Sequence, residues 1–397
     1  TKEALMLDHQ QRFKVMIGGS GPAAIEAALV LQQLAGARVE ATMITPDEEC
    51  VHLPMSVLAP FARSGSTRYP LAALVGDAGA VLRPGTIASV DPAAGEVRTA
   101  DGETLAYDAL LIAVGGIQQF PYPRALAYGG PGADERMHGL IQDVEAGYVK
   151  RVAFVVHPDV SWPLPLYELA LMTAERADDM CAHVEVTLVT PEAEPLEVFG
   201  TDIARDVRDL LDAAGIALMT NTRADVPKAN VIELRPGNEP LHVDRVVTLP
   251  TLTGPRIDGL PHDGAGFLPV DPHGRVRDAP GVYAAGDATD FPIKQGGIAC
   301  QQADAAAEAI AAAAGAPIEP SPFAPVLRAL LVTEHTARWL HHDPSADSRG
   351  TSTAAGPPED PPWTKISGRE LSLHLSQIPA TWRRIGKEPV AGRANKS

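Results

Sequence analysis

The chain has few of the features that mark secreted, membrane-spanning or nucleic-acid-binding proteins. Its 397 residues include only three cysteines, Cys50, Cys181 and Cys300, and these form no CxxC motif. This spacing excludes a disulfide framework and fits a reducing compartment. The 33 lysines and arginines are outnumbered by 50 aspartates and glutamates. The resulting formal charge of −17 excludes the basic surface that nucleic-acid binding requires.

Long hydrophobic runs are also missing. No stretch of about 18 apolar residues without charge occurs, so we expect no membrane-spanning helix. The first residues are polar and charged and show no signal-peptide core, so the expected location is the cytoplasm. His335, His341 and His342 lack the spacing of metal ligands, and no metal site is expected.

One strand–loop–helix–strand unit occurs twice. Residues 14–49 and 151–194 each begin with a short apolar run and end in closely matching segments, VEATMITPDEE and VEVTLVTPEAE. The loop between strand and helix differs between the copies. The first loop is rich in glycine, whereas the second has none and contains Trp162, Pro163 and Pro165. We therefore expect only the first copy to hold a dinucleotide pyrophosphate.

The first loop fits the dinucleotide-binding motif G-x-G-x-x-G/A between a strand and a helix. Gly19 allows a tight turn, Gly21 lets a pyrophosphate approach the backbone, and Ala24 allows close packing of the helix. The helix N-terminus adds oriented N–H groups and partial positive charge. A purely structural turn is the alternative interpretation. The candidate cofactor-binding residues here are Gly18, Gly19, Ser20, Gly21, Pro22, Ala23 and Ala24.

Three later segments follow the glycine loop in order along the chain. They are residues 85–87, residues 111–115 (LIAVG) and residues 282–288 (VYAAGDA). Together with the loop, they resemble the FAD site of the pyridine nucleotide–disulfide oxidoreductase superfamily. The resemblance implies that FAD is the cofactor and that Asp287 accepts hydrogen bonds from its ribityl or pyrophosphate part. The other implied contacts are Ile87, Ala113, Gly115 and Gly286.

The adenosine end departs from this pattern. An acid usually ends the second strand and binds the ribose hydroxyls. This chain has Thr45 at that position, followed by Pro46 and Asp47. We expect either the Thr45 hydroxyl or the carboxylate of Asp47, reaching back, to make this contact.

The second loop resembles another branch of the superfamily. Residues 158–169 (PDVSWPLPLYEL) are similar to the loop that places a redox cysteine over the flavin in sulfide:quinone oxidoreductases and flavocytochrome c sulfide dehydrogenases. Trp162 stands at the position of that cysteine, so two-cysteine sulfide chemistry is not expected. Residues 292–297 (PIKQGG) resemble the flavin-side segment of these enzymes, and residues 50–54 resemble type II NADH dehydrogenases. Prolines remove N–H donors, so NAD(P)H binding in the usual mode is not expected.

The catalytic candidates come from the segments that this resemblance places near the flavin ring. Lys294 is expected to stabilise the anionic reduced flavin, with Gln295 beside it as a cofactor contact. Cys300 follows at a helix N-terminus, which would lower the pKa of its thiol. The other candidates are Cys50, His52 and Trp162. The alternative for each is an ordinary structural role, as a surface lysine, a small core or loop cysteine, a loop histidine or a core aromatic.

We predict an α/β fold with two Rossmann-like domains, the second inserted in the first, and a small C-terminal α+β domain. The expected domains are FAD-binding (12–120 and 246–318), NAD(P)-binding-like (121–245) and C-terminal (319–397). A mobile loop is expected at 343–362, which is rich in Pro, Gly, Ser and Asp. The partly amphipathic tail, residues 364–387, either packs on the body or makes peripheral contact with a membrane or a partner.

The leading functional hypothesis is an FAD-dependent oxidoreductase that passes electrons from a small donor to a quinone-like or protein acceptor. One alternative is an NAD(P)H-dependent reductase with a modified loop, which rapid anaerobic bleaching by NADH or NADPH would support. The other is an FAD-containing partner or structural subunit with little turnover, which stable co-purification would support. A homodimer is a further expectation.

Overall fold

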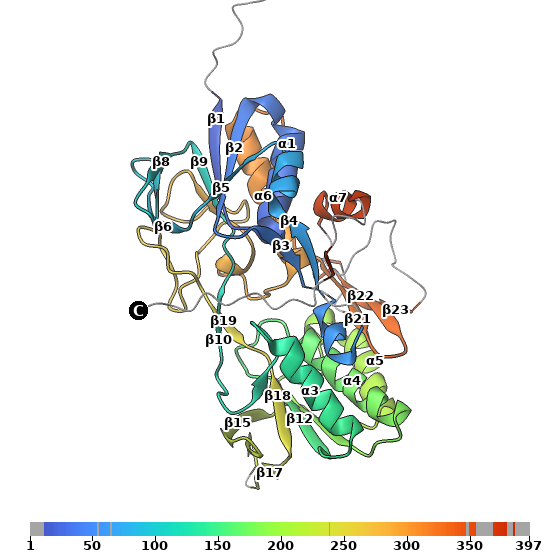
Figure 1. The fold of residues 1–397 in the computed structure, drawn as a ribbon. Helices are drawn as coiled ribbons and strands as arrows, with labels where there is room; N and C mark the ends of the chain where they lie inside the picture. Colours follow the sequence, from blue (N-terminus) through green and yellow to red (C-terminus); the bar gives the residue numbers. More distant parts are fainter. Residues whose placement is uncertain are drawn as a thin grey trace, which may run out of the picture.

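Two α/β units, each built on a parallel sheet and drawn one above the other in Figure 1, dominate the fold. The computed structural model describes residues 12–53, 55–63, 66–237, 239–346, 349–354, 368–378 and 384–385. The chain builds most of the first unit, crosses to form the second, and then returns to complete the first. This confirms the predicted α/β class and the insertion of one Rossmann-like unit in the other.

The first unit is a five-stranded parallel sheet in the order β20-β9-β1-β2-β5. Its strands are β1 (Phe13–Gly18), β2 (Val39–Thr45), β5 (Val81–Pro84), β9 (Ala109–Ile112) and β20 (Val282–Ala284). Helices α1 (Pro22–Leu34) and α6 (Gly296–Ala313) pack against each other on one face, where their alanines allow close approach. The other face is covered by β6 (Ile87–Asp91), β7 (Glu96–Thr99) and β8 (Thr104–Ala106). Burial on both faces explains why β1 and β9 are continuous apolar runs.

The second unit repeats this design with a parallel sheet in the order β11-β18-β12-β13-β14. Its strands are β11 (Leu126–Ala127), β12 (Arg151–Val155), β13 (Glu185–Val189), β14 (Ala217–Met219) and β18 (Arg245–Thr248). Its helices are α3 (Ala133–Glu145), α4 (Leu164–Asp179) and α5 (Thr201–Ala213). Where the chain crosses between units, β10 (Ile117–Gln119) pairs antiparallel with β19 (Thr251–Thr253). The segment β12–α4–β13 therefore matches β1–α1–β2, as the duplicated sequence predicts.

The remaining elements form small antiparallel sheets and short helices at the edges of the two units. One sheet joins β3 (Glu49–His52), β4 (Thr67–Pro70) and β24 (Arg384–Ile385), and another joins β15 (Arg223–Lys228), β16 (Val231–Arg235) and β17 (Leu241–His242). A third joins β21 (Leu327–Val332), β22 (Ala337–His342) and β23 (Thr351–Thr353). The short helices include α2 (Leu71–Asp77), η3 (Ser56–Phe61), η5 (Gly286–Ala288) and α7 (Leu371–Gln377).

The C-terminal elements pack on both units. Leu331 and Leu340 of the β21–β23 sheet share a hydrophobic cluster with α4, and α7 packs on α1. The loop predicted at 343–362 contains strand β23, so that part of the prediction is wrong; residues 347–348 and 355–362 lie outside the described residues.

The predicted amphipathic tail buries its apolar side where the structure describes it. Leu371, Leu375 and Ile378 are buried in the core of the first unit, and packing on the body is therefore the correct alternative for residues 368–378. Residues 364–367, 379–383 and 386–387 of the tail lie outside the described residues. Over the described ranges, no helix combines the length and apolar character needed to cross a bilayer.

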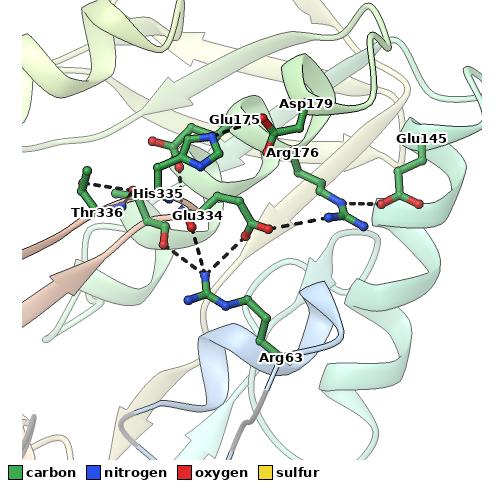
Figure 2. Close-up of polar contacts among 9 residues, drawn as sticks. Arg63, Glu145, Glu175, Arg176, Asp179, Glu334, His335 and Thr336 are labelled. Carbon is green, nitrogen blue, oxygen red and sulfur yellow. Dashed lines mark hydrogen bonds and ion pairs between the residues drawn. The ribbon is translucent and has the colours of Figure 1, made fainter.

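A polar cluster joins the turn after β21 to α4 and to the segment that follows η3 (Figure 2). Glu334, in the turn after β21, lies 3.7 Å from Arg176 of α4 and 3.5 Å from Arg63, which follows η3. Arg176 also pairs with Glu145 of α3 at 2.7 Å. Glu334 therefore contacts the side chains of two residues, Arg63 and Arg176, that are distant from it and from each other in sequence.

Candidate functional site

A cavity of about 530 Å³ opens at the carboxyl end of the first sheet. Ligands of open α/β sheets bind in the crevice at this end of the strands. The lining residues include Gly19, Ser20, Gly21, Pro22, Ala23, Thr45, Asp47, Ile87, Ala113, Gly115, Gly286 and Asp287. The structure thus brings together most of the residues that the sequence suggested for FAD. The exceptions, which do not line the cavity, are Gly18, Ala24, Lys294 and Gln295.

The two glycines of the loop after β1 have different surroundings. Gly19 has φ of +121°, and a Cβ placed there would lie 2.2 Å from the carbonyl oxygen of Ala113. A Cβ on Gly21 would meet no atom within 4 Å, because it points into open space. Gly19 is therefore required by the fold, whereas Gly21 leaves room beside the start of α1. The free N–H groups of that helix end suit a phosphate.

An acid does face the cavity near the end of β2. Asp47 accepts hydrogen bonds from the Ser20 hydroxyl at 2.5 Å and from the Thr45 hydroxyl at 3.2 Å. The Thr45 hydroxyl also accepts the N–H of Asp47 at 3.2 Å. Thr45 is buried while Asp47 is exposed, so the threonine orients the carboxylate. Of the two residues considered from the sequence, Asp47 is the better placed to reach a ribose.

The opposite wall is a tight turn that carries Asp287. Gly286 has φ of +73°, and its N–H donates to Oε1 of the buried Gln302 at 2.7 Å. Gln302 Nε2 also donates to the Thr289 hydroxyl at 3.2 Å. Burial raises the pKa of Asp287, and the nearby Lys294 ammonium opposes that rise. Sequence reasoning missed Gln302, because nothing in the sequence shows that α6 packs against this turn.

Lys294 is buried beside this turn and is not among the residues that line the cavity. Its ammonium donates to the carbonyl oxygen of Thr289 and lies 3.9 Å from the ring centroid of Phe267. Burial lowers the pKa of Lys294 to about 8, although nearby carboxylates favour its charged form. Gln295 caps α6 instead: its Oε1 accepts the N–H of Ile298 at 2.8 Å. This cap makes α6 begin at Gly296, four residues before the predicted start.

Cys50 and Cys300 are not activated thiols in this structure. Cys300 is completely buried, and burial raises its pKa well above the usual value, which reverses the expected effect of the helix N-terminus. Burial also raises the pKa of Cys50 to about 12. Cys181 is exposed. The structural alternative is therefore the better account of Cys50 and Cys300.

The other two catalytic candidates are Trp162, which lies away from the cavity, and His52, whose side chain the structure does not describe. Trp162 packs edge-to-face on Phe199, with ring centroids 5.5 Å apart, against the core of the second unit. His52 ends β3, and its side chain lies outside what the structure describes. Among the predicted catalytic side chains that the structure describes, Cys50 and Cys300 share the core of the first unit, whereas Trp162 packs on that of the second. The described ranges also contain no group of three or more potential metal ligands.

A second cavity, of about 540 Å³, lies at the matching end of the second sheet. Its lining residues are Val156, His157, Pro158, Asp159, Val160, Ser161, Pro163, Pro191, Glu192, Glu197, Val198 and Pro292. Glu192 corresponds to Asp47 in the duplicated sequence and accepts hydrogen bonds from Tyr167 at 2.6 Å and Thr190 at 2.7 Å. Burial raises the pKa of Glu192. Prolines, which have no N–H, and the carboxyl groups of Asp159, Glu192 and Glu197 line this cavity, so it offers a pyrophosphate fewer donors than the first cavity does.

Comparison with known proteins agrees with the duplicated design. The sequence profile of the pyridine nucleotide-disulphide oxidoreductase family matches residues 13–153 and 167–311. The chain belongs to this family. Residues 154–166, which include the second loop, fall between the matched stretches. No curated protein matches the chain.

Several solved structures share the fold. The sulfide:quinone oxidoreductase of Aquifex aeolicus has a TM-score of 0.77 at 20% identity, covering 86% of each chain. A ferredoxin reductase of Rhodopseudomonas palustris has a TM-score of 0.59 at 18% identity, covering 83% of this chain and 82% of its own. A covalent putidaredoxin reductase–putidaredoxin complex has a TM-score of 0.58 at 18% identity, covering 83% and 81%. Family and fold together identify the chain as an oxidoreductase of the flavoprotein type.

Proposed function

We propose that the first cavity binds FAD and that the chain uses it to pass electrons from a small donor to a quinone-like or protein acceptor. The observation that carries the proposal is the convergence on one cavity of the glycine loop, the end of β2, and residues 85–87, 113–115 and 285–287. That cavity has a free helix N-terminus at one wall and an aspartate at the other. Its volume of about 530 Å³ is that of an ordinary cofactor site.

Each wall has a separate task in this proposal. The first turn of α1, opened by Gly21, would receive the pyrophosphate. Asp47 would bind the ribose hydroxyls, and Asp287 would meet the ribityl or pyrophosphate part. Lys294, which fixes the turn of Asp287 through Thr289, adds a positive charge to that side of the site. When bound, FAD supplies two-electron transfer chemistry.

The donor reaction in this proposal does not use the two-cysteine chemistry of sulfide oxidation. Such chemistry needs accessible thiolates. Cys50 and Cys300 are buried with raised pKa values, and Trp162 is partly buried and packs against the core of the second unit. The sulfide:quinone oxidoreductase and ferredoxin reductase structures that share the fold support a quinone-like or protein acceptor.

The test is an anaerobic titration of the purified chain. We expect a yellow protein with a flavin spectrum, whose flavin is not bleached rapidly by NADH, NADPH or sulfide. Rapid bleaching of the flavin by NADH or NADPH would favour a nicotinamide-dependent reductase. Sulfide-dependent quinone reduction at a rate like that of sulfide:quinone oxidoreductases would contradict the proposal that the chain, with Trp162 in place of the redox cysteine, does not use two-cysteine chemistry. Failure of every donor, with stable co-purification of another protein, would favour a subunit with little turnover. A colourless protein that FAD cannot reconstitute would disprove the central claim.

We further propose the domain limits 12–120 with 246–318 for FAD binding, 121–245 for the inserted domain and 319–397 for the C-terminal domain. A cytoplasmic location is supported by the scarcity of cysteine and the absence of CxxC. A homodimer stays a prediction, which sedimentation of the purified chain would test.

A further inference from the structure

The carboxylate of Asp287 stands on a short turn whose other residues are buried. Residues 286–289 include the single turn of η5, which follows β20. Asp287 is half-buried and lines the first cavity, whereas the other three residues are buried. The direction of this carboxylate therefore depends on how the backbone of the turn is held.

A buried glutamine contacts both ends of this turn. Gln302 lies on α6, which packs beside α1 in the first unit (Figure 1), and it is 5% exposed. Its Oε1 accepts the N–H of Gly286 at 2.7 Å, and its Nε2 donates to the Thr289 hydroxyl at 3.2 Å. The Thr289 hydroxyl donates in turn to the carbonyl oxygen of Gly286 at 2.9 Å. Gln302 itself does not line the cavity.

The packing around Gly286 limits where the turn can move. A Cβ placed on Gly286 would lie 3.2 Å from the Cβ of Ala299 on α6 and 3.4 Å from the Cβ of Ala23 on α1. The backbone therefore has little room on the side of the two helices. A buried N–H without an acceptor is costly. Loss of the Gln302 amide would thus favour a shift of the turn toward the cavity, where the N–H finds another partner.

The far end of the turn is also held from a second direction. Thr289 is completely buried, and its carbonyl oxygen accepts a bond from the ammonium of Lys294. Lys294 thus fixes the main chain of Thr289, while Gln302 fixes its hydroxyl. Contacts from two side chains define the conformation of the turn before any ligand enters, which lowers the cost of binding.

The neighbouring glutamine offers a matched comparison. Gln301 also lies on α6, but it binds the backbone of Val326 instead of the turn. Its Nε2 donates to the carbonyl oxygen of Val326 at 2.9 Å, and its Oε1 accepts the N–H of the same residue at 2.9 Å. The two adjacent glutamines therefore use the same atoms on different segments of the chain.

We propose that Gln302 is a positioning residue for the cofactor: it holds Gly286 and Thr289 so that the carboxylate of Asp287 is aimed into the first cavity. This inference rests on the proposed function, because FAD is the ligand that Asp287 would meet there. Gln302 acts through Asp287 and does not touch the cofactor.

The first test compares two glutamine variants of the full chain. Gln302→Met removes both polar atoms from a side chain of similar length, so the Kd for FAD should rise about tenfold or more. Flavin fluorescence measures this Kd after the bound FAD is removed. In the FAD-free chain, hydrogen exchange of a peptide that contains Gly286 should become faster. Gln301→Met should leave both measurements at their wild-type values, because it does not contact the turn.

A double-mutant cycle tests whether Gln302 acts through Asp287. Asp287→Ala alone should weaken FAD binding. In the Asp287→Ala background, Gln302→Met should change the Kd by less than about twofold, because no carboxylate is left to aim. Thr289→Val should weaken binding as Gln302→Met does, and Thr289→Ser, which keeps the hydroxyl, should restore most of the lost affinity. General loosening of the core would not separate serine from valine in this way.

Two outcomes would overturn the proposal while the wild-type chain binds FAD. One is a wild-type Kd in Gln302→Met, and the other is a full loss of affinity from Gln302→Met in the Asp287→Ala background. If Gln302→Met does not fold, the two Thr289 variants decide the matter, because equal Kd values for valine and serine contradict the proposal. Failure of the wild-type chain itself to bind FAD would instead disprove the proposed function, and this role with it.

Discussion

At the scale of single residues, the duplicated sequence reuses the same positions for different contacts. Glu26 and Glu168 occupy matching places in α1 and α4, and each accepts backbone N–H bonds from the C-terminal part of the chain. Asp47 and Glu192 also match: Asp47 faces the first cavity and accepts a hydrogen bond from Ser20, whereas Glu192 faces the second cavity and accepts one from Tyr167. Side chains at matching positions of the two units therefore occupy similar places in the fold, while their hydrogen-bond partners differ.

The contrast between Gly19 and Gly21 gives a prediction at this scale. Gly19→Ala is expected to destabilise the fold by about 1–3 kcal/mol, because its positive φ and the carbonyl of Ala113 both disfavour a Cβ. Gly21→Ala is expected to leave the urea unfolding midpoint within error but to weaken FAD binding, because its Cβ occupies open cavity. Unfolding curves and FAD titration by fluorescence measure the two effects. Equal loss of stability in both variants would contradict this account.

At the scale of elements, the strands and helices of the duplicated unit are confirmed because strong local signals define them. Pro22 begins α1, and continuous apolar runs mark β1 and β12. The errors lie where a tertiary contact sets the boundary. Gln295 starts α6 early because its amide both caps the helix and binds the carbonyl of Arg328 at 3.1 Å.

The loop between β12 and α4 yields a prediction about Trp162. Trp162→Ala should destabilise the protein by about 2–3 kcal/mol, because the indole packs on Phe199 and the core of the second unit. Its flavin content and spectrum should be unchanged, since Trp162 does not line the first cavity. Tyr148→Ala is the control, because Tyr148 is 81% exposed and should cost less than about 0.5 kcal/mol. Loss of the flavin spectrum in Trp162→Ala would show a role at the cofactor.

At the scale of the whole molecule, the polar cluster of Figure 2 joins the turn after β21 to α4 and to the distant segment that follows η3. Arg176→Ala leaves Glu145 and Glu334 without their shared partner and should cost about 1–2 kcal/mol, reduced by the partial exposure of the arginine. Arg205→Ala removes a more exposed pair with Asp202 and should cost less than about 0.5 kcal/mol. Urea unfolding measures both. An equal cost for the two variants would mean that the cluster adds no stability beyond a surface pair.

The sequence by itself determined the duplicated α/β units, the glycine loop and the order of the segments that suggested FAD. These features depend on short-range patterns: apolar runs, a proline at a helix start, and glycine where the backbone turns sharply. Only the tertiary structure decided that Cys300 is buried and that Trp162 packs on Phe199. The same holds for the hydrogen bonds that Glu26 accepts from the backbone of Glu370 and Leu371, far away in sequence. Burial and pKa depend on which segments meet in space, and a single sequence does not encode that as a local signal.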